Sequence, residues 1–103
     1  MNINKMLKEA QRMQEKLAAA QADVAAQTFE ATAGGGKITV TVNGSGDVQK
    51  LKIDPSVADP NDIEALEDLL LAGLRKAQDD AREASAAQMR SLTGGLNIPG
   101  LSL

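Results

Sequence analysis

The stretch KITVTVNGSGDVQKLKIDPSV, residues 37 to 57, decides the fold. Its apolar residues Ile38, Val40 and Val42 alternate with polar ones, which is the period of two expected for a strand with one buried face and one wet face. Residues 43 to 47, NGSGD, tolerate positive φ and predict a tight reversal. Residues 48 to 53 are then the returning strand, so the stretch predicts a β-hairpin.

One more strand is expected before the hairpin. Residues 27 to 33, QTFEATA, alternate Phe29, Ala31 and Ala33 with polar side chains, and Gly34-Gly35-Gly36 supplies the turn into the hairpin. Three antiparallel strands form a small meander if helix covers one face. The residues we expect on the covered face are Phe29, Val40, Val42 and Leu51. Lys50 and Lys52 fall on the opposite, wet face.

A long helix is predicted ahead of the strands, from Ile3 to about Ala26. No Gly or Pro interrupts residues 1 to 33, and Ala, Gln, Glu, Lys and Leu dominate the segment. Apolar side chains recur at alternating steps of three and four, which is an a/d seam sustained over three heptads. The seam consists of Ile3, Met6, Ala10, Met13, Leu17, Ala20 and Val24. So narrow a seam is typical of a helix that packs against another helix.

A second long helix is predicted after the strands. Asp59 is its expected cap and Pro60 suits the first helical position. A helical stripe, apolar but for its last member, continues to about Leu92, and Gly94-Gly95 ends the helix. The stripe consists of Ile63, Leu66, Leu70, Leu74, Ala77, Ala81, Ala84 and Gln88. Leu71 and Met89 lie off this stripe. They are either single exposed apolar side chains or a second contact surface in an oligomer.

Together these elements predict one α+β domain over residues 1–92, in the order helix, three-stranded antiparallel meander, long helix (α-β-β-β-α). Helices of about 24 and 32 residues are roughly 36 and 48 Å long, whereas a compact body of this size has a radius of gyration of about 13 Å. We therefore expect protruding helical arms whose apolar faces are covered in a homodimer. The interface residues expected are Met6, Met13, Leu17, Leu71 and Met89.

The apolar, Gly- and Pro-containing tail over residues 93–103 carries no charge. It either covers apolar surface on the body or makes a contact between dimers. Residues 1 to 16 carry charges every few positions and include no apolar run long enough for a signal peptide or a membrane span. We expect a cytoplasmic protein that does not enter a membrane.

The composition argues against catalysis. The 103 residues include no Cys, His, Trp or Tyr, so thiol chemistry, imidazole chemistry and the common soft-metal sites are absent. Asp54, Asp59 and Asp62 are candidate Mg²⁺ ligands, but they stand at a predicted strand exit and helix start. No Gly-Lys-Ser/Thr motif follows the glycines at 34–36, so they predict a turn. We expect no enzyme activity, no cofactor, no metal and no small-molecule substrate.

The formal net charge of −3 gives no long-range attraction to a polyanion, so nucleic-acid binding requires a local cluster of cations. At about 100° per residue, four cations of the first helix fall within roughly an 80° sector. They are Lys5, Lys8, Arg12 and Lys16, called the cationic strip below. Such a strip either contacts phosphate or is an ordinary solvated helix face. Arg82 and Arg90 on the second helix are secondary candidates, for which the alternative is intrahelical ion pairing.

Four segments, in this order and spacing, resemble the YbaB/EbfC family of bacterial nucleoid-associated proteins across nearly the whole chain. They are MLKEAQRMQEKLAAAQ (6–21), KITVTVNGSGDVQKLKIDPSV (37–57), EALEDLLLAGLRKA (64–77) and MRSLTGGLNIPGL (89–101). The resemblance implies a tweezer-like dimer that binds double-stranded DNA through protruding helical arms, with roles in nucleoid organisation, gene regulation and DNA protection. It supplies no catalytic residue.

The functional expectation is therefore a nucleoid-associated protein that binds duplex DNA as a homodimer, mainly through backbone phosphates. The cationic strip carries the contact, and Arg82 and Arg90 add to it. The alternative is a helical protein–protein adaptor without direct DNA binding, which also explains the acidic balance and the apolar seams.

Overall fold

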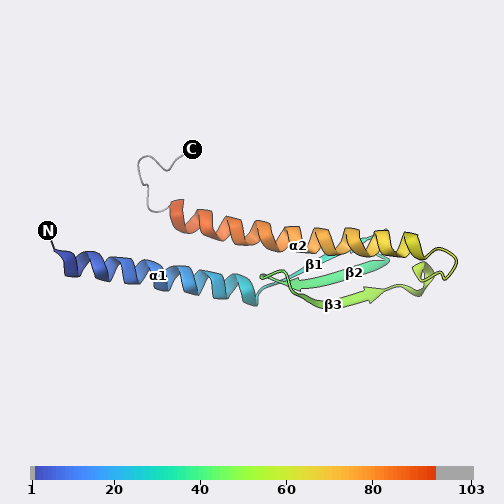
Figure 1. The fold of residues 1–103 in the computed structure, drawn as a ribbon, viewed down its shortest axis with the longest axis horizontal. Helices are drawn as coiled ribbons and strands as arrows, with labels where there is room; N and C mark the ends of the chain where they lie inside the picture. The colour runs from blue at the N-terminus through green and yellow to red at the C-terminus, as the bar shows by residue number, and fades with distance from the viewer. Residues whose placement is uncertain (1, 95–103) are drawn as a thin grey trace.

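A computed structural model of the chain describes residues 2–94. Its elements are α1 (Ile3–Ala26), the strands β1 (Thr28–Ala33), β2 (Ile38–Asn43) and β3 (Val48–Ile53), the short 3-10 helix η1 (Pro55–Val57) and α2 (Ile63–Gly94). Figure 1 shows α1 and α2 extending beyond the same end of the sheet. The predicted order of a helix, three strands and a long helix is confirmed, and η1 is an addition to it.

The start of α2 differs from the prediction. The first helical residue is Ile63, not Pro60. Asp59 closes a turn of its own, because its Oδ1 accepts from the Asn61 amide (2.9 Å) and its carbonyl accepts from the Asp62 amide (3.0 Å). Asp62 caps the helix instead, since its Oδ1 accepts from the Ala65 amide (3.3 Å) in the first turn.

At its other end α2 continues to Gly94, slightly beyond the expected end. Of the predicted apolar tail over residues 93–103, the part from residue 95 onward lies outside the described residues.

The sheet is an antiparallel meander in the order β1-β2-β3. Val40 pairs with Ala31 on one side and with Leu51 on the other, so these three side chains share one face. The register of β2 and β3 shifts between Thr41 and Val42, as in a β-bulge, and Val42 then pairs with Val48. The bulge thereby keeps Val48 on the same face as Leu51.

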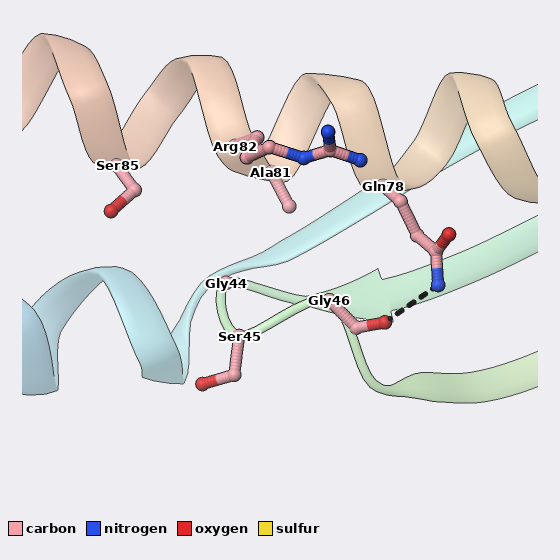
Figure 2. A pocket seen from close by; sticks show the side chains of 7 residues that line it. All are labelled: Gly44, Ser45, Gly46, Gln78, Ala81, Arg82 and Ser85. Carbon is pink, nitrogen blue, oxygen red and sulfur yellow. Dashed lines mark hydrogen bonds between the residues drawn. The ribbon is translucent and has the colours of Figure 1, made fainter.

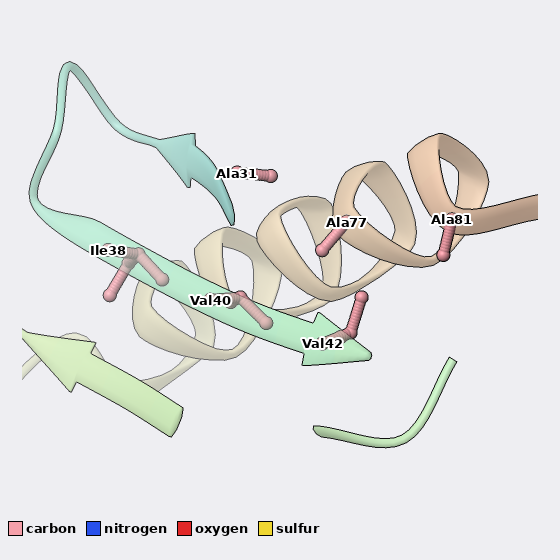
Figure 3. Close-up of a cluster of buried hydrophobic side chains, with 6 residues drawn as sticks. All are labelled: Ala31, Ile38, Val40, Val42, Ala77 and Ala81. Carbon is pink, nitrogen blue, oxygen red and sulfur yellow. The ribbon is translucent and has the colours of Figure 1, made fainter. Parts of the chain in front are cut away.

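The core lies between this face and α2, which packs on β1 and β2. Figure 3 shows its buried side chains, which are Ala31, Ile38, Val40, Val42, Ala77 and Ala81. The alanines of α2 allow its backbone to approach the sheet closely. Phe29, Val40 and Val42 are on the covered face as predicted. Leu51 also lies on this face, but α2 packs mainly on β1 and β2 and leaves it 44% exposed, so the predicted cover of Leu51 is wrong.

The molecule is elongated, with a Cα radius of gyration of 19.9 Å and extents of 72 × 27 × 16 Å. Only Ala20 and Val24 of the α1 seam are buried, at the end that approaches α2 and the sheet. At the free end, Ile3 is 66% exposed and Met6 is 57% exposed. Most of α1 is therefore a protruding arm, as the sequence predicts. Within residues 2–94 no helix is long and apolar enough to cross a bilayer.

The burial of Ile38 gives a first testable prediction. Ile38→Val removes one methylene group from a fully buried site, so we expect the free energy of unfolding to fall by about 0.5–1.5 kcal/mol in urea denaturation. Ile53→Val is the matched control, since Ile53 is the cross-strand partner of Ile38 but is only half-buried. A control loss as large as that of Ile38→Val would contradict the assigned core.

Candidate nucleic-acid interface

The cationic strip lies on the free arm of α1. Asn2 caps this helix, because its Oδ1 accepts from the Lys5 amide (3.2 Å), which fixes the start of α1 beside the first strip residue. All four strip side chains are exposed. An open hollow of about 250 Å³ at the tip of the arm is lined by Asn2, Asn4, Lys5 and Lys8. Amide groups and ammonium groups thus converge at the tip.

Within the part of the chain that the structure describes, the strip has no carboxylate partners. Among residues 2–94, none of Lys5, Lys8, Arg12 and Lys16 forms an ion pair, although Glu9 and Glu15 lie on the same exposed helix. An unpaired cation on an exposed arm has no internal contact to lose when it meets a phosphate. This separates the strip from Arg82 and Arg90, whereas its place on the free arm separates it from Lys50 and Lys52 on the sheet.

The two α2 arginines are already paired. Arg82 Nη2 lies 3.2 Å from Asp79 Oδ1, and Arg90 Nη2 donates to Glu83 Oε1 at 2.8 Å. The intrahelical alternative is therefore the arrangement observed for both. Exposed pairs of this kind contribute only about 0.2–1 kcal/mol, so a phosphate can displace the carboxylate. Arg82 and Arg90 stay secondary candidates.

The outer face of the sheet carries Lys50 and Lys52. They are exposed, and with Glu30, Thr39 and Thr41 they line an open hollow of about 220 Å³ on the face opposite α2. Lys37 pairs with Asp54 at 3.8 Å. The predicted wet face is confirmed, and Glu30 lines the same hollow as the two lysines.

The three candidate magnesium ligands have other partners. Asp54 Oδ1 accepts from the Ser56 amide at 2.9 Å, and this hydrogen bond, ahead of the charge of Lys37, lowers the pKa of the Asp54 carboxyl. Asp59 and Asp62 accept from backbone amides at the entry to α2. Residues 2–94 include no cluster of three or more His, Cys, Asp or Glu side chains arranged to hold a metal ion. The glycines at 34–36 form the β1–β2 turn, as predicted.

The predicted interface residues are spread over both helices. Met6 and Leu71 are exposed, the latter at 48%, whereas Met13, Leu17 and Met89 are half-buried. The sequence reasoning missed further exposed apolar side chains, among them Leu7 at the arm tip, Val48 and Leu51 on β3, and Ile63 at the start of α2. For Val48 and Leu51, the alternation of apolar and polar residues along β3 predicts the face of the sheet on which they lie. What it does not reveal is that α2 is too narrow to cover three strands.

The comparisons with known proteins agree with this architecture. The family model described as the YbaB/EbfC DNA-binding family matches residues 1–96. A nucleoid-associated protein of Clostridium novyi (strain NT) is 45% identical over 101 residues, covering 98% of this chain and 89% of that protein. A nucleoid-associated protein of Gluconobacter oxydans (strain 621H) is 45% identical over 103 residues, covering 99% and 96%.

Among solved structures, the uncharacterized protein HP0035 from Helicobacter pylori superposes with a TM-score of 0.61. It is 24% identical in sequence, and the match covers 72% of this chain and 86% of that one. At that identity the likeness concerns the fold alone. The family assignment depends instead on the family model and on the relatives above, which match nearly the whole chain. Membership of a DNA-binding, non-enzymatic family agrees with the expectation of no catalytic function. The chain belongs to the YbaB/EbfC DNA-binding family.

Proposed function

We propose that this protein binds double-stranded DNA as a homodimer in the bacterial nucleoid of the cytoplasm, mainly through backbone phosphates. Its roles are nucleoid organisation, gene regulation and DNA protection. The observation that carries the proposal is the cationic strip, four exposed cations that form no ion pair within residues 2–94, on a protruding arm of a chain whose family binds DNA. Arg82 and Arg90 contribute secondary contacts after releasing their carboxylates.

Phosphate contacts explain how a chain with a net charge of −3 binds a polyanion. Charges separated by more than about 8 Å are largely screened at physiological salt, so acidic residues elsewhere do not cancel the strip. The described residues include no Trp or Tyr and only Phe29 as an aromatic side chain, and Phe29 packs against the core. Stacking on single-stranded bases therefore has no platform, which favours duplex DNA.

A homodimer accounts for the apolar side chains that one protomer leaves exposed. Soluble monomers rarely expose large contiguous apolar patches. In this chain Ile3 and Met6 are exposed along the seam of α1, and Leu71, Val48 and Leu51 are exposed on the body. We assign the interface to Met6, Met13, Leu17, Leu71 and Met89, with Val48 and Leu51 added from the structure.

The strip gives a prediction for DNA affinity. If a dimer engages about four to seven phosphates, log affinity falls with log salt at a slope of roughly −3.5 to −6. Lys8→Ala combined with Arg12→Ala is expected to weaken binding to unrelated duplexes by similar factors, and each lost contact lowers the magnitude of the slope by about 0.9. The measurement is a duplex-DNA shift assay across salt concentrations.

The matched control is Lys50→Ala combined with Lys52→Ala, which removes the same charge from the outer face of the sheet. It is expected to leave the slope nearly unchanged. Equal losses for the two double variants would mean that total charge, and not the strip, governs binding. No duplex binding by the wild-type protein at low salt would contradict the DNA proposal and favour the helical adaptor.

A further inference from the structure

A polar cleft lies between the tip of the β2–β3 hairpin and α2, and the function proposed above does not use it. Its volume is about 290 Å³. Figure 2 shows the side chains and glycines that line it. From the hairpin come Ser45 and Gly46, and from α2 come Gln78, Ala81, Arg82 and Ser85. The cleft is at the base of the two arms, beside the end of α1 (Figure 2).

Hydrogen bonds hold the hairpin side of the cleft in place. Asn43 Oδ1 accepts from the amides of Ser45 and Asp47, both at 3.0 Å, and the Asn43 carbonyl accepts from the Gly46 amide at 2.9 Å. Gln78 Nε2 donates to the Gly46 carbonyl at 3.2 Å and so ties the hairpin tip to α2 (Figure 2). The cleft is therefore preformed, which lowers the entropic cost of binding a ligand.

The groups that line the cleft suit an anion. Ser45 and Ser85 supply hydroxyl donors, Gln78 has a second amide hydrogen, and Arg82 supplies a guanidinium. No carboxylate is among the lining residues, although acidic residues outnumber basic ones in the chain. Arg82, which lines the cleft, forms an ion pair with Asp79, and both side chains are largely exposed. Such a pair gives way to a phosphate at little cost.

We propose that this cleft is a phosphate-binding site that takes a backbone phosphodiester of duplex DNA, in addition to the contacts of the cationic strip. The inference rests on the proposed function. It adds the hairpin tip and two serines to the interface and gives Arg82 a defined place in it. A phosphodiester carries two unesterified oxygens, which match the several donors that face one another across the cleft.

The first test places a negative charge in the cleft. Ser45→Asp is expected to weaken duplex binding at least ten-fold at about 0.15 M salt, because the new carboxylate both repels the phosphate and pairs with Arg82. Ala65→Asp adds the same charge at an exposed position in the first turn of α2, away from the cleft and from both arms, and is expected to change affinity less than about two-fold. Equal effects of the two variants overturn the inference.

The second test removes the cation. Arg82→Gln is expected to weaken duplex binding about five-fold per lost contact at about 0.15 M salt and to lower the magnitude of the salt slope by about 0.9. Arg75→Gln is the control, since Arg75 is an exposed α2 arginine that does not line the cleft. If the cleft variants match their controls while Lys8→Ala with Arg12→Ala still weakens binding, the cleft is wrong and the proposed function stands.

Amide chemical shifts identify the source of the phosphate. Titration of labelled protein with a short duplex is expected to shift the Ser45 and Gly46 amide resonances, whereas inorganic phosphate or a mononucleotide at the same phosphate concentration leaves them in place. Equal shifts from inorganic phosphate would overturn the assignment to DNA in favour of a site for free phosphate. If the wild-type protein does not bind duplex at low salt, the proposed function and this inference both fail.

Discussion

Gly44→Ala is expected to lower the free energy of unfolding by about 3 kcal/mol or more, because it forces α1 away from the hairpin. A Cβ atom added at Gly44 would overlap the carbonyl group of Val24 and lie 2.8 Å from Val24 Cγ1. That carbonyl accepts the Gln27 amide at 3.0 Å in the cap of α1, and the Val24 side chain is buried. Because the carbonyl belongs to the backbone, the overlap is relieved only if α1 and the hairpin move apart.

The cost at Gly44 is steric. Positive φ angles occur at Gly34, Gly35, Gly36 and Gly46 but not at Gly44, so alanine meets no unfavourable backbone conformation there. Gly35→Ala is the matched control. A Cβ at Gly35 meets nothing within 4 Å, but the φ of 66° costs about 1–2 kcal/mol for a residue other than glycine.

Thermal unfolding followed by circular dichroism, at one fixed protomer concentration, measures both variants. A loss of about 3 kcal/mol corresponds to a fall in Tm of roughly 12 °C or more for a domain of this size. Because the cleft depends on the same hairpin, Gly44→Ala is also expected to weaken duplex binding. A Gly44→Ala variant no less stable than Gly35→Ala would contradict the close contact between the hairpin and α1.

The sequence predicts the fold where its signals are local. The switch from helical period to alternation at residues 27–53, the NGSGD turn and the uninterrupted segment before residue 33 together yield α1 and all three strands within one residue. The prediction misplaces the start of α2 because Asp59-Pro60-Asn61-Asp62 contains three possible caps. Side-chain hydrogen bonds decide between them, and spacing alone does not reveal those bonds.

The site is less predictable because it depends on how distant elements meet. Helical periodicity places the cationic strip on one side of α1. It does not show that the strip residues form no ion pair with a carboxylate within residues 2–94. The cleft joins Ser45 to Arg82 across 37 positions of sequence (82 − 45), and no local pattern marks that approach. Leu51 is a second example. The alternation along β3 predicts the face on which Leu51 lies, but its exposure depends on where α2 packs on the sheet.

Leu17→Asp is expected to convert the proposed homodimer into monomers or to unfold it. Leu17 lies in the α1 seam between exposed Met6 and buried Ala20, in the part of the seam that the protomer itself covers only partly. If a second copy completes the cover, an aspartate there is buried without a partner. The cost of an unpaired buried carboxylate is several kcal/mol, and about 3 kcal/mol already raises a dissociation constant more than 100-fold.

Sedimentation and light-scattering mass, together with helical circular dichroism, measure this effect at micromolar protomer concentration. Leu7→Asp is the control, because it makes the same change on the same exposed arm but off the seam, and we expect it to stay dimeric. A wild-type protein that is monomeric with native helical circular dichroism would contradict the homodimer. A dimeric Leu17→Asp variant combined with a monomeric Leu7→Asp variant would move the interface from the seam to the adjacent flank of the arm, where Leu7 lies about 90° around the helix.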